Sequence, residues 1–237
     1  MKANEKINEK TNAKTNLTEV AFILDKSGSM SGLEKDTIGG FNSMLEQQKE
    51  QRGECRITTV LFDHNYELLH DRIDVRAVAP ITEREYRVGG STALLDAIGR
   101  TINKIAAAQK NTAKEYRADK VLFVIITDGE ENSSREFSAR KVKKMIEQQK
   151  KRYDWEFIFL GANIDAVETA GHFGIRADCA VDYVPDGEGT ELNFRTMGNV
   201  LCAFREEGCL PVGCLEEIRA DMRKRGGRRG KALYASE

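Results

Sequence analysis

Short, uninterrupted apolar runs that alternate with segments of helical periodicity constrain the fold of this chain more than any other feature. The runs cover residues 20–24, 57–62, 121–126 and 157–160, and they are rich in β-branched and aromatic side chains. Strands that are buried on both faces of a parallel sheet have this pattern, because neither face meets solvent. Between the runs, apolar residues recur at the three- and four-residue spacing of an amphipathic helix. The sequence therefore predicts an α/β fold with helices on both faces of a parallel sheet.

One connection is too short to cross over between parallel strands. Residues 63–65 separate the run at 57–62 from a further predicted strand at 66–70, so this strand has to pair antiparallel at an edge. A weaker strand is predicted at 179–184, followed by a helix over 192–205. The expected architecture is a Rossmann-like, three-layer α/β fold whose central sheet is mostly parallel, with one antiparallel edge strand.

The two ends of the chain differ in composition from its middle. Residues 1–16 are almost all Lys, Asn, Glu and Thr, so we predict a polar, disordered tail. The α/β domain is predicted over residues 17–207. Residues 208–237 are predicted to form an amphipathic segment, up to residue 225, and then a basic tail. The pattern leaves open whether the amphipathic segment packs on the domain.

Charge and cysteine content limit the class of function. The chain has 37 Lys and Arg against 38 Asp and Glu, so it carries no overall basic field for nucleic acid. We find no apolar segment of signal-peptide length at the N-terminus and no run that approaches the ~20 residues needed to span a bilayer. The five cysteines form no C-x-x-C pair, which favours reduced thiols, with a local bridge between Cys209 and Cys214 as the alternative. We therefore expect a cytoplasmic protein with no membrane segment.

Oxygen-bearing side chains follow two of the predicted strands. Asp25, Ser27 and Ser29 come directly after the first strand, and Asp128 follows the strand at 121–126. Because the carboxyl ends of strands in an open α/β sheet share one edge, these side chains are expected to lie together.

A third hydroxyl group is expected from the loop that precedes the second predicted helix. Thr92 is our candidate, although Ser91 beside it can fill a capping role in the same place. Three hydroxyls and two carboxylates, without thiolate or imidazole, are typical ligands of hard cations. The pattern predicts a site for Mg²⁺, with Mn²⁺ or Ca²⁺ as alternatives.

At these positions the chain resembles the von Willebrand factor A family. The metal-ion-dependent adhesion site of that family has the pattern D-x-S-x-S, then a distant Thr and a distant Asp, and all five positions are matched here. The segments LDKSGSM, GGSTALLDAI and VIITDGEE are similar to the bacterial and phage branch. The resemblance implies that Ser27, Ser29 and, in one state, Thr92 bind the metal directly. It also implies that Asp25 and Asp128 act largely through water, and that a carboxylate of the ligand completes the coordination shell.

The function predicted from these features is a non-catalytic, metal-dependent protein-binding module. Its divalent cation would recognise a Glu or Asp of a partner protein at a surface cleft. Assemblies with AAA+ ATPases are among the roles that the resemblance implies, beside adhesion, protein degradation and RNA-repair scaffolds. The fold does not select among these roles.

Alternative interpretations stay open. The serines can be helix caps, and Asp128 with Gly129 can be a simple turn. A Mg²⁺-dependent phosphoryl- or nucleotide-processing enzyme can use the same edge, although no G-x-S-x-G motif is present and Ser27 stands where a haloacid-dehalogenase-type phosphatase has its second Asp. A nucleic-acid scaffold can use residues 219–231, which contain seven basic residues and one acid.

Overall fold

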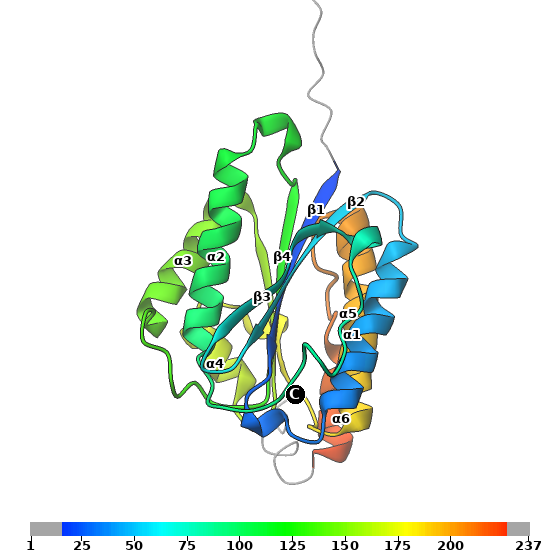
Figure 1. Cartoon of the computed structure of the whole chain (residues 1–237), viewed down its shortest axis with the longest axis vertical. Coiled ribbons are helices and arrows are strands. Elements are labelled where there is room, and N and C mark those ends of the chain that lie inside the picture. The colour runs from blue at the N-terminus through cyan, green and yellow to red at the C-terminus, as the bar shows by residue number, and fades with distance from the viewer. Residues whose placement is uncertain (1–15, 227–237) are drawn as a thin grey trace, which may run out of the picture.

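The computed structural model describes residues 16–226, and a six-stranded sheet forms its centre (Figure 1). The strands lie in the order β3-β2-β1-β4-β5-β6. All neighbours are parallel except β2 and β3, which confirms the predicted sheet with one antiparallel edge strand. The strands are β1 (Leu17–Asp25), β2 (Glu54–Phe62), β3 (Tyr66–Asp74), β4 (Lys120–Thr127), β5 (Glu156–Gly161) and β6 (Ala180–Asp182).

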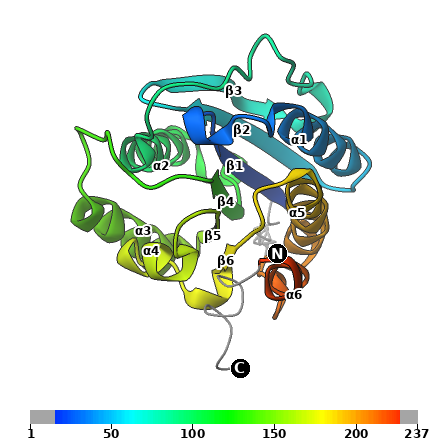
Figure 2. The same ribbon diagram turned by 90° about the horizontal axis from the view of Figure 1, so that it is seen from below.

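Helices cover both faces of this sheet, as the three-layer prediction requires (Figures 1 and 2). The helices on one face are α1 (Glu34–Lys49), α5 (Gly187–Glu207) and α6 (Glu216–Arg225). The helices on the other face are α2 (Leu94–Asn111), α3 (Ala139–Tyr153) and α4 (Ala166–His172). Single turns of 3-10 helix occur at η1 (Gly28–Met30), η2 (Val75–Ala77), η3 (Lys114–Tyr116) and η4 (Ala177–Cys179).

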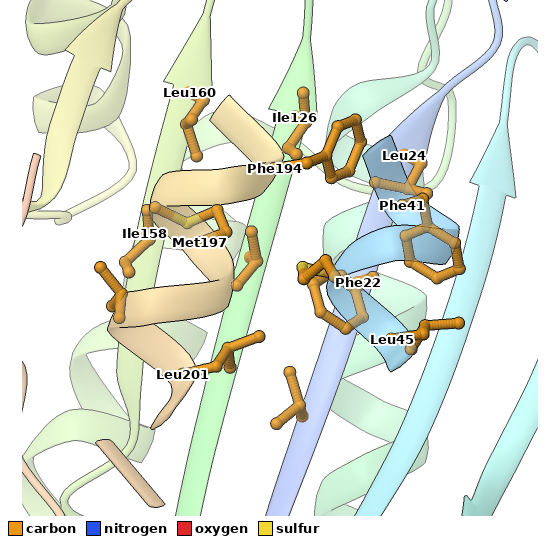
Figure 3. Packing of buried hydrophobic residues seen from close by; sticks show 14 of the residues in the cluster. Phe22, Leu24, Phe41, Leu45, Ile126, Ile158, Leu160, Phe194, Met197 and Leu201 are labelled. Atoms are coloured by element: carbon orange, nitrogen blue, oxygen red, sulfur yellow. The ribbon is translucent and has the colours of Figure 1, made fainter. Parts of the chain in front are cut away.

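Strand β1 lies inside the sheet and supplies side chains to a hydrophobic core on each face. Every residue of β1 is buried, which explains its uninterrupted apolar run. On the α1 and α5 face, the Phe22 and Phe41 rings meet edge to face with centroids 5.3 Å apart, and Phe194 follows at 6.2 Å from Phe41 (Figure 3). On the other face, Ile23 joins the core that α2 and α3 cover. The two cores fix the position of β1, and therefore of the residues that follow it.

The reversed edge strand β3 contains a β-bulge that places a charged side chain against the sheet. The β2–β3 register shifts between Ile57 and Thr59, and Arg72 adopts a left-handed φ of 53°. The Arg72 guanidinium binds the Glu19 carboxylate with two bonds, of 2.6 and 2.9 Å. Glu19 lies on β1 and is fully buried, so the ion pair compensates a charge that has no access to water.

Helix α6 packs on the domain, which settles a point that the sequence left open. Leu215, Ile218 and Met222 are at most 3% exposed. The buried Arg219 donates to three backbone carbonyls, those of Ala177, Asp178 and Ala180, at 2.9 to 3.2 Å. The amphipathic pattern of this segment therefore reflects contact with α5 and β6.

Several elements differ from the sequence expectations, and β3, for example, extends to Asp74 instead of residue 70. Helix α4 was not predicted, because its seven residues are too short to show helical periodicity. Strand β6 has three residues instead of six, and α5 begins at Gly187 instead of residue 192. The earlier start has a local cause, since the Asp186 side chain caps α5 by accepting a bond from Gly189 N at 2.8 Å.

The structure also bears on the predictions made for the cysteines, for membrane-spanning segments and for the two ends of the chain. All five cysteines are free thiols, so the alternative of a bridge between Cys209 and Cys214 is wrong. Within residues 16–226, no helix has the length and apolar character needed to cross a membrane. The predicted N-terminal tail, apart from Asn16, and the basic tail beyond Gly226 lie outside the described residues.

The docking of α6 can be tested by truncating one buried side chain. We expect Ile218→Ala to lower the free energy of unfolding by about 2–4 kcal/mol, because it removes buried methyl groups and leaves a cavity. Denaturant titration measures this change. Glu217→Ala is the control, since Glu217 is the exposed neighbour on the same helix. Equal unfolding midpoints for the two variants would show that α6 does not pack on the domain in solution.

Candidate metal centre

Asp25 ends β1 at the edge of the sheet that faces the viewer in Figure 2. The residue is 1% exposed. Its Oδ1 accepts a hydrogen bond from Ser27 N at 2.7 Å, and its Oδ2 accepts one from Thr127 Oγ1 at 2.5 Å. Thr127 is the last residue of β4, the neighbour of β1. Two adjacent strand ends therefore fix the orientation of this carboxylate.

The loop after β1 is held against the loop that precedes α2. Gly28 N donates to Gly90 O at 3.0 Å, and Gly89 N donates to Lys26 O at 2.9 Å. Gly90 has a φ of +78°, and a Cβ there would lie 2.3 Å from His64 Nδ1. Only glycine fits both constraints. This pairing brings the two serines and the threonine of the predicted site to one place.

The hydroxyl groups and the second carboxylate lie close together at this edge. Ser27 Oγ and Ser29 Oγ are 3.0 Å apart, and the Ser29 side chain lies close enough to the Asp128 carboxylate to lower its pKa. A Cβ on Gly129 would lie 3.0 Å from Ser29 Oγ and 3.3 Å from Thr92 Oγ1. A glycine at this position therefore leaves space between the two hydroxyls. The structure brings together all five residues that the sequence singled out.

Side chains of the loop after β4 hold Thr92 and the start of α2, and the sequence reasoning missed them. Thr92 N donates to Asn132 Oδ1 at 2.9 Å, and Asn132 N donates back to Thr92 O at 3.1 Å. Glu131 Oε2 accepts a bond from Leu95 N, in the first turn of α2, at 2.9 Å. The only sequence signal for this contact was the acidic residue Glu131 shortly after the Asp-Gly pair. Its partner Leu95 lies 36 residues away, so no local sequence pattern identifies the pair.

Two further residues support the site from behind. The buried Tyr86 hydroxyl donates to the Asp25 carbonyl at 2.5 Å, so it fixes the backbone at the end of β1. Asp96 accepts the backbone N–H groups of residues 135–137 at 2.8 to 2.9 Å. The Asp96 carboxylate is therefore an anchor for the loop, and it is not available as a metal ligand.

Burial makes both carboxylates of the site unfavourable as charges. Desolvation raises the pKa of Asp25 to about 6, against hydrogen bonds from Thr127 and Ser27 that lower it, and the nearby Asp128 charge adds to the rise. The pKa of Asp128 is also raised by burial, while the bond from Ser29 lowers it. Neither carboxylate forms an ion pair within residues 16–226. Two charges of one sign thus share a buried edge without a countercharge.

A hard divalent cation fits the donor atoms of this site. Asp128 Oδ1 is buried and accepts no hydrogen bond from the described part of the chain. An orphaned acceptor beside three hydroxyl oxygens is the environment in which a cation supplies both a ligand bond and the missing countercharge. Among residues 16–226 no cluster of three or more His, Cys, Asp or Glu side chains is placed to hold a metal. The donors here are of the kind that Mg²⁺, Mn²⁺ and Ca²⁺ prefer.

Solved structures share this arrangement of strands and helices. Neither a protein-family sequence model nor a curated protein matches the chain. The proximal thread matrix protein 1 of the mussel byssus, solved with zinc in its MIDAS motif, superposes with a TM-score of 0.55 at 11% identity, over 78% of this chain and 48% of that one. A von Willebrand factor type A structure from Catenulispora acidiphila gives 0.53 at 17% identity, over 77% and 42%.

The chain has the von Willebrand factor A fold. The manganese-loaded TRAP protein of Plasmodium vivax is a third similar structure, with a TM-score of 0.50 and 19% identity, over 68% of this chain and 62% of that one. The chain spans between 42% and 62% of the lengths of these three structures. At such identities the likeness establishes the fold. Metal binding by this domain stays a prediction, which rests on its own residues.

Metal binding can be measured through stability. We expect Mg²⁺ or Mn²⁺ to raise the Tm of the domain, since a ligand of the native state at about 100 times its Kd adds about 2.7 kcal/mol. Thermal scans in EDTA and in about 10 mM metal test this expectation. That metal concentration is well above the Kd of most Mg²⁺ or Ca²⁺ sites in proteins. The double variant Ser27→Ala with Ser29→Ala should lose the shift. Ser31→Ala, an exposed serine of the same loop, should keep it. An unchanged midpoint for the unmodified domain would argue against the site.

The buried charge of Asp25 gives a second test, made without metal. Its folded pKa of about 6 lies above the ordinary 3.8, so the charge destabilises the fold above pH 6 and has no such effect below about pH 4. In EDTA at neutral pH, we expect Asp25→Asn to stabilise the domain by a margin of the order of 3 kcal/mol or less. The gain should fade as the pH falls from 6 to 4. Denaturant titration at several pH values measures it, with the exposed Glu83→Gln as control. A variant that is less stable at neutral pH would contradict this expectation.

Proposed function

We propose that this von Willebrand factor A domain is a non-catalytic, metal-dependent module that binds an acidic side chain of a partner protein. The observation that carries the proposal is the orphaned, buried Asp128 Oδ1 beside the hydroxyls of Ser27, Ser29 and Thr92. No partner within residues 16–226 satisfies that oxygen. The fold adds support, because a neighbour with the same architecture has been solved with zinc in its MIDAS motif and another with manganese.

The residues of the site divide into ligands and supports. Ser27, Ser29 and Thr92 would supply neutral oxygens, which leave the net positive charge of the cation largely uncompensated. Asp25 is held by Thr127 and by a backbone N–H, so it would order the neighbouring serine and the waters around the cation. When bound, Mg²⁺ would supply a positive charge with a coordination position for an outside oxygen. A partner carboxylate is the protein group that matches such a position.

The exposed fractions of the site residues indicate the side from which a partner protein would approach the cation. Asp25, Ser27, Thr92 and Asp128 are buried, at no more than 3% exposure, whereas Ser29 is exposed. A partner would therefore reach the cation from the side of Ser29 and η1, at the carboxyl edge of the sheet (Figure 2).

The non-catalytic assignment rests on how the nearby groups are used. The Tyr86 hydroxyl donates to a carbonyl, and the Thr127 hydroxyl donates to Asp25. Both are occupied as supports, so neither is placed to activate a serine. General acid–base catalysis requires a titratable group within hydrogen-bond reach of the reacting atom. We propose Mg²⁺ as the physiological ion, a cytoplasmic partner, and an AAA+ ATPase assembly as the first class of partner to examine.

Partner binding should depend on the metal and on a partner carboxylate. Capture from the native host, with this protein as bait in Mg²⁺ and in EDTA, identifies the proteins whose retention needs the metal. Titration of such a partner then measures its Kd. We expect Ser27→Ala with Ser29→Ala to weaken binding by at least about tenfold, the equivalent of about 1.4 kcal/mol. A Glu→Gln or Asp→Asn change in the partner should weaken it similarly, while Ser31→Ala should not.

The outcomes of this titration separate the competing functions. Equal affinity in Mg²⁺, in EDTA and for the double variant would eliminate recognition through a metal. Asp25-dependent turnover of a phosphate ester or nucleotide would establish the enzyme instead. Salt-sensitive binding of nucleic acid that survives the serine substitutions would favour a scaffold.

A further inference from the structure

A second concave site lies at the opposite end of the sheet from the metal centre. It is a groove of about 550 Å³ between the last turns of α2 and α3. Strands β4 and β5 begin shortly after these helices end, so the groove lies at the amino edge of the sheet, at the top of Figure 1. Its volume falls within the range of sites for small organic ligands.

The walls of the groove are positively charged. Lys110, Arg117 and Arg152 line it, and no acidic residue does so within the described part of the chain. The Arg117 guanidinium is held by two backbone carbonyls, that of Thr112 at 2.8 Å from Nε and that of Lys110 at 3.2 Å. One cationic group is therefore positioned before any ligand arrives. An anionic group is the complement of such walls.

Two aromatic side chains, Tyr153 and Trp155, line the groove. Trp155 is 4% exposed and stacks on Phe123, with ring centroids 5.5 Å apart and planes 21° apart. The Tyr153 ring centroid lies 6.5 Å from that of Trp155, with the ring planes tilted by 42°, and Tyr153 is 57% exposed. The small side chains of Ala106 and Ala118 also line the groove. The exposed Tyr153 ring is a surface on which a planar ring system can stack.

A buried amide in the same groove has an unused acceptor. Gln149 lines the groove, is 7% exposed, and its Oε1 has no hydrogen-bond partner within residues 16–226. A buried acceptor without a partner destabilises a fold, so its presence in a groove calls for an explanation. A ligand that carries an N–H group next to its ring would provide the missing donor.

We propose that this groove binds a nucleotide, that is, a planar nitrogen heterocycle that bears N–H donors and is linked to a phosphate. The phosphate would lie against Arg152 and Lys110, the heterocycle against the exposed ring of Tyr153, and an N–H of the base would donate to Gln149. No single feature of the groove requires this ligand. The combination of cationic walls, aromatic side chains and an unsatisfied amide acceptor matches all parts of a nucleotide at once. The site is independent of the metal centre.

The chain contains a built-in probe for the test, because Trp155 is its one tryptophan and lies in the groove. The four nucleoside 5′-monophosphates are titrated into the full chain in EDTA. Tryptophan fluorescence, excited where nucleobases do not absorb, and calorimetry follow the binding. We expect saturable binding of at least one nucleotide. The matching nucleoside and inorganic phosphate should each bind at least about tenfold more weakly, since each lacks one part of the ligand.

Substitutions locate the binding site. Arg152→Gln and Gln149→Leu should each weaken nucleotide binding by at least about fivefold. Arg140→Gln is the matched control, since Arg140 is exposed at the other end of the same helix. Gln149→Leu removes an unsatisfied buried group, so the variant should remain folded, and a thermal scan verifies this. If the Gln149→Leu variant does not fold, the nucleotide affinity of the Arg152→Gln variant is a sufficient test of the binding site.

Three results would overturn the proposal. The first is the absence of saturable binding for all four nucleotides. The second is inorganic phosphate binding as tightly as the nucleotides, which would reduce the groove to a general anion site. The third is nucleotide binding that Arg152→Gln leaves unchanged, which would place the ligand elsewhere.

Discussion

The hydrogen bond from the Thr127 hydroxyl to the Asp25 carboxylate is the contact on which the candidate metal centre depends. It joins the ends of β1 and β4, two strands that are held side by side by the cores on both faces of the sheet. The strand pairing brings the two carboxylates close together, and the burial that stabilises the strands also makes both carboxylates unfavourable as charges. The packing that forms the sheet therefore also makes a nearby positive charge favourable at this edge.

Hydrogen bonds connect the three loops that form the site at this edge. Backbone bonds between Lys26, Gly28, Gly89 and Gly90 fasten the first loop to the second, and Asn132 fastens the second loop to the third. Each loop supplies one part of the donor set, and hydrogen bonds within the chain hold each loop to the next. A site that is held in this way pays little conformational entropy when it binds its ligand.

Much of this could be predicted from the sequence, for a physical reason. Strands buried on both faces leave uninterrupted apolar runs, and the polar residues that end them must lie on the edge of the sheet, so Asp25 and Asp128 were predictable as neighbours. The residues that hold the site in place were not predictable. Asn132, Glu131 and Tyr86 act through contacts between residues far apart in the chain, for which no local pattern exists. Helix α4 was missed because seven residues carry too little periodicity, and the groove between α2 and α3 was missed because its lining comes from three separate segments.

Arg219 has a consequence for the solubility of the domain. Strand β6 is the last strand of the sheet, and an outer strand normally presents unpaired carbonyl groups to any extended chain that approaches it. The Arg219 side chain occupies the carbonyl of Ala180 on that strand, together with two carbonyls of the turn before it. At the other margin, the bulge that carries Arg72 interrupts the regular ladder of β3. Both margins of the sheet therefore carry a feature that disfavours strand addition, which lowers the tendency of a domain with a strongly apolar interior to join edge to edge with its own copies.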